Sequence, residues 1–129
     1  MNDQTQTSPI HPETRIGHVH LKVADLDRAL AFYSGVLGFE LTQRYGSQAA
    51  FLSAGGYHHH LGVNTWAGRA EPASEDDARL LEWRIVLPGE DDVRVVADRL
   101  QAAGHAVVGQ DGGWLTTDPW GTPLRLAAG

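Results

Sequence analysis

The feature that most constrains the fold of this chain is a pattern of hydrophobic alternation that occurs twice. Residues 16–23 alternate apolar and polar side chains as a strand does, and a stretch with helical spacing follows and ends at Gly38. Residues 39–43, 49–54 and 57–64 then predict three short strands between glycine-containing turns. The first half of the chain therefore predicts one strand, one helix and three further strands, in that order.

The same order of elements restarts near residue 80. Residues 80–87 predict a strand, and residues 90–103 predict a helix with Gly104 at its end. Three more strands follow, at residues 106–108, 114–117 and 123–127. Equivalent positions of the two halves lie about 65 residues apart, which indicates an internal repeat. We therefore predict an α+β fold made of two βαβββ modules.

The repeat also sets the expected domain organisation. Residues 1–14 are rich in Gln, Thr, Ser and Pro, and we expect a disordered tail there. We expect residues 15–128 to form a single domain. Within it, module one covers residues 15–65, a linker covers 66–78 and module two covers 79–128.

The composition excludes several classes of function. The chain has no cysteine, so any bound metal would have only nitrogen and oxygen ligands. The net charge of −6 and the lack of a Lys and Arg run argue against nucleic-acid binding. Residues 1–12 lack the apolar core of a signal peptide, and no apolar stretch is long enough to span a membrane. We therefore expect a cytoplasmic protein that binds neither nucleic acid nor membrane.

The tripeptide His58-His59-His60 indicates a polar site at the end of module one. Three adjacent imidazoles are costly in a protein core and suit the binding of a metal, a proton or an anion. Residues 57–64 predict one strand, in which His58 and His60 share a face with Asn64, and His59 faces the helices.

The polar faces of the first strands of both modules contain further candidates. The alternation of residues 16–23 places His18, His20 and Lys22 on one face. By the same count, the polar residues expected on the corresponding face of module two are Glu82, Arg84 and Arg125. Cations thus gather where a ligand would bind, although the net charge is negative. This pattern favours an anionic or phenolate-like small molecule.

Three motifs relate the chain to a known superfamily. They are GHVHLKV at residues 17–23, VLGF at residues 36–39 and DPWGTP at residues 118–123. With these motifs, residues 15–128 resemble the vicinal oxygen chelate superfamily, which includes glyoxalase I, fosfomycin and bleomycin resistance proteins, and extradiol dioxygenases. Residues 17–66 are most similar to the amino-terminal module of catechol 2,3-dioxygenase-like proteins. The resemblance implies a curved mixed sheet with helices on its convex side and a metal in its concave cup.

The resemblance also implies roles for particular residues. In that superfamily the metal ligands come from the first and last strands of each module, at positions that match His18, His60, Glu82 and Arg125. Extradiol enzymes have a His and a Glu where this chain has Glu82 and Arg125. The implied metal site is therefore His18, His60 and Glu82, which suits one divalent iron, manganese, nickel or zinc ion. The implied acid–base groups are His20 and His58, and the implied substrate-binding groups are Lys22, Asn64, Arg84 and Arg125.

Two functions stay open at this point. The first is a divalent-metal-dependent enzyme, dioxygenase-like, which acts on a small aromatic diol or another compound with vicinal oxygens. In the second, a Glu82–Arg125 ion pair fills a metal-free cup, and the chain is a non-catalytic ligand-binding or resistance module for a small anionic or aromatic molecule. Single two-module chains of the superfamily commonly dimerise, so we expect a homodimer. The linker is long enough for each cup to be built by one chain or by two.

Overall fold

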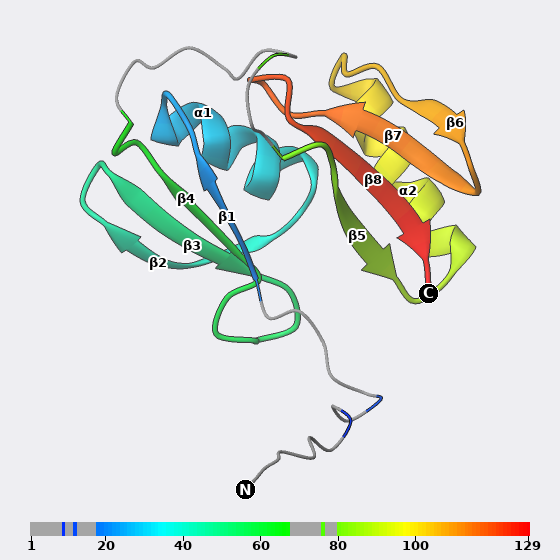
Figure 1. Ribbon diagram of the computed structural model, residues 1–129, viewed down its shortest axis with the longest axis horizontal. Helices are drawn as coiled ribbons and strands as arrows, with labels where there is room; N and C mark the ends of the chain where they lie inside the picture. The colour runs from blue at the N-terminus through cyan, green and yellow to red at the C-terminus, as the bar shows by residue number, and fades with distance from the viewer. Residues whose placement is uncertain (1–8, 10–11, 13–17, 68–75, 77–79) are drawn as a thin grey trace, which may run out of the picture.

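A computed structural model describes residues 9, 12, 18–67, 76 and 80–129, and it contains the two βαβββ modules that the repeat predicts (Figure 1). Module one consists of β1 (Val19–Lys22), α1 (Leu26–Leu30), η1 (Ala31–Val36), β2 (Glu40–Tyr45), β3 (Ala49–Ser53) and β4 (Leu61–Asn64). Module two consists of β5 (Trp83–Leu87), α2 (Glu90–Ala102), β6 (Val108–Gln110), β7 (Gly113–Thr117) and β8 (Pro123–Ala128). Most of the expected tail at 1–14 and of the linker at 66–78 lies outside the described residues.

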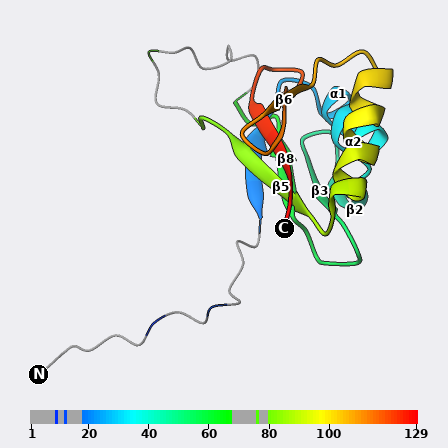
Figure 2. The same cartoon turned by 90° about the vertical axis from the view of Figure 1, so that its right-hand side faces the viewer.

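Each module contains a four-stranded mixed sheet with the same topology. The strand orders are β1-β4-β3-β2 and β5-β8-β7-β6, with β1 parallel to β4 and β5 parallel to β8. The remaining pairs are antiparallel. The helices lie on one side of the sheets, as the view in Figure 2 shows. We call the other side the open face; its expected curvature into a cup stays a prediction.

The first helix begins at a side-chain cap and changes its geometry half-way. The Asp25 carboxylate accepts a hydrogen bond of 3.0 Å from the Arg28 backbone N–H, which caps α1. The helix then widens into the π-helical segment η1, which turns Phe32 and Tyr33 into the core together. Gly38, with φ of +96°, ends the helical stretch, as its position in the sequence predicts.

The hydrophobic core is shared by the two modules, and η1 joins them. The buried side chains of the core come from both sheets and from α1, η1 and α2. The Tyr33 hydroxyl donates a hydrogen bond of 2.7 Å to the Asp118 carboxylate of module two, and both residues are buried. The Tyr33 ring also lies 6.2 Å from the Trp83 ring. The two modules are therefore held together by a buried polar contact as well as by packing.

Several predicted strands begin later than expected, among them the one predicted at 106–108, which is β6 and starts at Val108. The strand predicted at 57–64 starts at Leu61, and the strand predicted at 80–87 starts at Trp83. None of the described helices is long and apolar enough to cross a membrane.

Candidate functional site

The polar side chains that flank and belong to β1 lie on the open face. His18, His20 and Lys22 are exposed, whereas Leu21 and Val23 are buried in the core. The period-two alternation predicted for this strand is therefore present. β1 is an edge strand that pairs only with β4 in its sheet, so these three side chains lie along one edge of the sheet.

Gly62 allows His20 to lie close to the sheet. His20, Gly62 and Phe51 are register partners on neighbouring strands, so they share one face. A Cβ atom at Gly62 would lie 2.9 Å from His20 Nδ1 and 3.2 Å from a ring carbon of Phe51. The missing side chain thus leaves room for the His20 imidazole to approach the edge of the Phe51 ring, with 6.2 Å between the ring centroids.

Four histidines and one phenylalanine form a continuous group of rings on the open face. The His59 ring lies 4.7 Å from His18, 4.6 Å from His58 and 4.8 Å from Phe51, centroid to centroid. His20 reaches the same group through Phe51. We call His18, His20, His58, His59 and Phe51 the imidazole surface.

The expectation that His59 faces the helices is wrong. Its ring contacts His18 and Phe51, and Phe51 lies outside the core on the face opposite α1 and η1. The physical reason is local: residues 57–60 form a loop before β4 begins at Leu61. Side chains alternate between faces only within extended strand backbone, so the count used for residues 57–64 does not apply there.

The position of His59 also sets its protonation. Desolvation lowers the pKa of His59 below its usual range, and repulsion from the neighbouring His58 and His18 lowers this pKa further, with smaller effects from His20 and His60. The imidazole is therefore neutral at neutral pH. A neutral imidazole offers one lone pair and one N–H, which suits a hydroxyl or phenol group as a hydrogen-bond partner.

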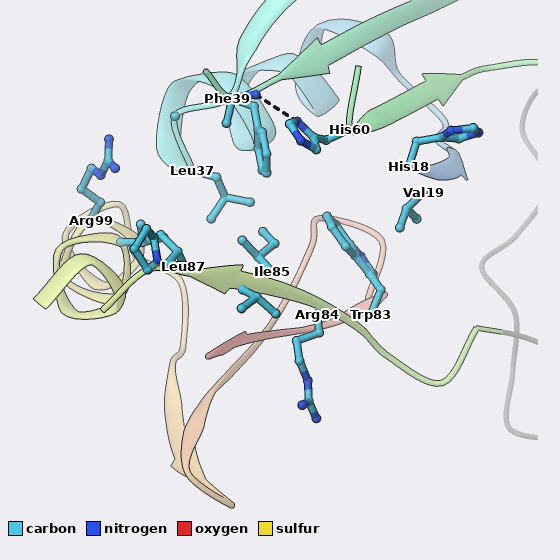
Figure 3. Close-up of a pocket in the computed structure, with 15 residues that line it drawn as sticks. His18, Val19, Leu37, Phe39, His60, Trp83, Arg84, Ile85, Leu87 and Arg99 are labelled. Atoms are coloured by element: carbon cyan, nitrogen blue, oxygen red, sulfur yellow. Dashed lines mark hydrogen bonds between the residues drawn. The ribbon is translucent and has the colours of Figure 1, made fainter. Parts of the chain in front are cut away.

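His60 does not belong to the imidazole surface. Its Nδ1 atom accepts a hydrogen bond of 3.1 Å from the Ala54 backbone N–H, and its ring stacks 4.5 Å from the ring of Tyr57. Figure 3 shows the His60 ring turned toward Phe39, whereas the His18 ring points away from this region. The Nδ1 lone pair of His60 is thus already used within module one.

Glu82 and Arg125 form an ion pair in module two. Arg125 Nε lies 2.9 Å from one oxygen of the Glu82 carboxylate, and a terminal nitrogen lies 3.3 Å from the other. Arg125 also donates to the backbone carbonyl and the side-chain oxygen of Gln110, at 2.7 and 3.2 Å. The hydrogen bond from Arg125 lowers the pKa of Glu82, and the same bond raises the pKa of Arg125. Both groups stay charged at neutral pH, which matches the metal-free alternative considered from the sequence.

The remaining expected site residues are spread over both modules. Asn64 is buried, and its side-chain oxygen accepts a hydrogen bond of 3.0 Å from the Trp66 backbone N–H. This bond holds the turn that places the exposed Trp66 ring 6.1 Å from His20. Lys22 is exposed at the end of β1, and Arg84 is exposed on β5. Lys22 therefore lies beside the imidazole surface, while Arg84 lies in the other module.

The residues of the expected metal site do not come together in the part of the chain that the structure describes. Within it, no group of three or more His, Asp or Glu side chains is arranged to hold a metal ion. His60 is engaged by Ala54, and Glu82 is engaged by Arg125. A site formed by His18, His60 and Glu82 would need both of these contacts to break.

A cavity of about 780 Å³ lies between the two modules. Module one contributes residues around β1, Leu37 and His60, and module two contributes β5 and the inner face of α2. Figure 3 shows Leu37, Phe39 and Ile85 gathered in its middle, with Arg84 and Arg99 farther out. Its walls come from elements that are apart in the chain, and three residues predicted for the site, His18, His60 and Arg84, line it.

The sequence and the fold together determine the family. Residues 15–123 match the model of the glyoxalase/bleomycin resistance protein/dioxygenase superfamily. The chain belongs to this superfamily. The resemblance inferred from the three motifs is thereby confirmed.

One curated relative within the superfamily is a catechol-2,3-dioxygenase of Bacillus subtilis. It is 43% identical over 119 residues, which are 91% of this chain and 41% of the relative. The chain thus spans about two fifths of that relative's length.

Several solved structures share the superfamily fold. A lactoylglutathione lyase from Agrobacterium tumefaciens has a TM-score of 0.69 and 19% identity, with 92% of this chain and 96% of that chain covered. A glyoxalase/dioxygenase from Nostoc punctiforme has a TM-score of 0.72 and 14% identity, with 96% and 98% covered. At these identities the likeness shows the fold alone.

The resemblance to the superfamily predicted site residues on strands, and it did not predict the contacts that form the imidazole surface. His59, Phe51, Gly62 and Trp66 were not predicted as parts of a site. The alternation of β3 was the available signal for Phe51, since it places this ring on the face opposite the buried Ala50 and Leu52.

Proposed function

We propose that the protein binds a small aromatic diol, or a related compound with two adjacent oxygen atoms, on the imidazole surface. The observation that carries the proposal is the group of imidazoles packed around Phe51, in which His59 is half-buried and neutral and the other three rings are exposed. The catechol-2,3-dioxygenase relative, 43% identical over most of this chain, supports the aromatic diol as the ligand class.

The chemistry of the surface suits such a ligand. An aromatic ring packs well on the rings of Phe51 and Trp66, which flank His20 at 6.2 and 6.1 Å. The imidazole of His59 accepts a proton or a hydrogen bond from one hydroxyl group. The ammonium group of Lys22 favours a ligand that carries partial or full negative charge on its oxygens.

A divalent metal is the group that the superfamily implies for catalysis on vicinal oxygens. The three residues expected to bind it, His18, His60 and Glu82, do not fit a metal site as they are placed. The Nδ1 atom of His60 accepts from Ala54, and the carboxylate of Glu82 is held by Arg125. The geometry of a single chain therefore supports ligand binding without a metal best.

A metal-dependent, dioxygenase-like enzyme is the second candidate function. The identity to the Bacillus subtilis relative favours it. This function requires that His18 and His60 come together with a carboxylate, within one chain or across the expected homodimer.

Titration with catechol tests the proposal. We expect saturable shifts of the His20 and His59 ring signals in NMR spectra, measured with metal-free protein in the absence of oxygen. His59→Ala should weaken binding about fivefold or more, since it removes one hydrogen bond in a partly desolvated site. His105→Gln, a change of the same residue type in module two, should leave the affinity unchanged. Equal affinities in both variants would contradict the proposed site.

Elemental analysis separates the two candidate functions. The protein is purified without a histidine tag or chelating resin, and it is compared with His18→Ala and His60→Ala. Near-stoichiometric metal that is lost in both variants, together with oxygen uptake on addition of catechol, would establish the enzyme. Catechol binding with metal at background after attempted reconstitution would establish the metal-free module.

A further inference from the structure

The walls of the cavity between the modules combine apolar and basic side chains. Its lining is largely apolar, from Val19 and Leu37 in module one to Ile85 and Leu87 in module two. The charged or titratable side chains of the lining are His18, His60, Arg84 and Arg99. All four are basic, and no carboxylate is among the described residues that line the cavity. In a chain of net charge −6, this combination is selective for an apolar molecule with a negative group.

Trp83 forms part of the wall between β5 and the core. Trp83 lines the cavity and is 9% exposed. Its indole N–H has no hydrogen-bond partner among the described residues. A buried polar group without a partner is costly, and such groups are uncommon in folded proteins. The nitrogen has less than 1 Å² of accessible surface, so a molecule in the cavity would contact the Trp83 ring and not this nitrogen.

His60 provides a hydrogen-bond donor in the wall. Its Nδ1 atom accepts from the Ala54 backbone N–H, so the proton of the neutral imidazole resides on Nε2. Figure 3 shows this ring on the cavity side, across from Ile85, while Arg84 and Arg99 lie toward the periphery. The cavity thus has an apolar middle, an imidazole N–H donor in its wall and two guanidinium groups at its rim.

We propose that this cavity is a binding site for an apolar carboxylate, that is, an ionised acid with a hydrocarbon body. The hydrocarbon body packs among Leu37, Phe39 and Ile85, and the carboxylate accepts hydrogen bonds from the His60 imidazole and from Arg99 at the rim. This site shares His18 with the imidazole surface, but its ligand does not depend on the function proposed for that surface. A ligand here contacts both modules at once, so binding also stabilises their relative placement.

The indole signal of Trp83 provides a direct readout. The chain has four tryptophans, and Trp83→Phe identifies which of the four indole N–H signals in a nitrogen–proton NMR spectrum belongs to Trp83. We expect octanoate to shift this signal saturably, because the Trp83 ring lines the cavity. We expect the uncharged analogue 1-octanol to bind about twofold to fivefold more weakly, which is the range for the loss of one exposed ionic contact.

Two arginines on α2 give a matched pair of variants. Arg99→Gln removes the cation that lines the cavity, and we expect it to weaken octanoate binding about twofold to fivefold. Arg94→Gln removes an exposed cation of the same helix that does not line the cavity, and the affinity should stay unchanged. Ile85→Trp should fill the apolar middle and weaken binding about tenfold or more, with the dispersion of the same spectrum showing whether the variant is folded.

Absence of any Trp83 shift with octanoate at millimolar concentration would overturn the proposal. Equal binding of octanoate and 1-octanol, with no effect of Arg99→Gln, would overturn the carboxylate as the ligand class. Catechol binding to the imidazole surface is measured on histidine signals, so failure of either proposal is seen independently of the other.

Discussion

The buried hydrogen bond between Tyr33 and Asp118 predicts how strongly the two modules depend on each other. The Tyr33 side chain is 0% exposed, and its hydroxyl lies 2.7 Å from the carboxylate of Asp118, which is 5% exposed. Tyr33→Phe removes only the hydroxyl group and keeps the ring that packs against Trp83. A hydrogen bond to a charged group contributes about 1.5–3 kcal/mol, so we expect the free energy of unfolding to fall by that amount.

The loss should lie toward the lower end of this range. Asp118 keeps two further hydrogen bonds, from the backbone N–H groups of Trp120 and Thr122, both at 2.9 Å. Urea unfolding followed by tryptophan fluorescence measures the change. Tyr45→Phe is the matched control, since Tyr45 is 54% exposed and such a surface change usually alters stability by less than about 0.5 kcal/mol. An equally small effect of Tyr33→Phe would refute the argument that this bond couples the modules.

The pH dependence of the same pair of proteins gives a second test. Burial raises the pKa of Tyr33, and repulsion by Asp118 and the hydrogen bond raise this pKa further. Below pH 10 the Tyr33 hydroxyl is protonated in both the folded and the unfolded chain. The difference in free energy of unfolding between the unchanged protein and Tyr33→Phe, here called the advantage, is therefore constant. Above pH 10 the unfolded chain releases the proton and the folded chain keeps it, so the advantage should fall by about 1.4 kcal/mol per pH unit. A stability difference that stays constant from pH 10 to higher pH would contradict the raised pKa.

Three further changes have outcomes that follow from single contacts. Gly62→Ala places a methyl group against His20 and Phe51 and should lower the free energy of unfolding by about 1–3 kcal/mol in the same urea assay. The double variant with His20→Ala should recover part of this loss. Arg125→Gln should raise the pKa of Glu82 toward its usual range, measured by carbon NMR titration, whereas Arg84→Gln should change that pKa much less, since Arg84 is only a minor cause of the shift. Asp92→Ala removes the carboxylate that accepts from the Gly89 N–H at 3.1 Å and should cost about 0.5–1 kcal/mol in thermal unfolding, while Asp91→Ala serves as the exposed control.

The fold could be predicted from the sequence because each helix or strand has its own local sequence pattern. The alternation around His18, His20 and Lys22 identified β1 and its exposed face, and Asp25 and Gly38 marked the ends of the first helical stretch. The repeat of this pattern then determined the second module. The change from α1 to the π-helical η1 had no such signal, because both helix types place apolar side chains at similar spacing.

The candidate site was accessible only in part, because alternation assigns side chains to faces and does not choose their partners. It placed Glu82 and Arg125 on one face, and the structure joins them through two hydrogen bonds. It failed for His59, since residues 57–60 leave the strand geometry on which the count depends. Contacts across strands, such as His59 with Phe51, follow from register, which a single sequence specifies weakly for short strands.

The charge pattern of the site links these observations to function. Arg125 stands where the superfamily's extradiol members have a carboxylate, and this replacement gives Glu82 a permanent cationic partner. A carboxylate that is already paired is a poor metal ligand, because the metal must displace the guanidinium as well as bind. Among the described residues, the histidines of the imidazole surface have no such ion-pair partner, and His59 is neutral beside His18 and His58. We therefore expect ligand chemistry on module one, while module two contributes the Glu82–Arg125 ion pair and the cationic rim of the cavity.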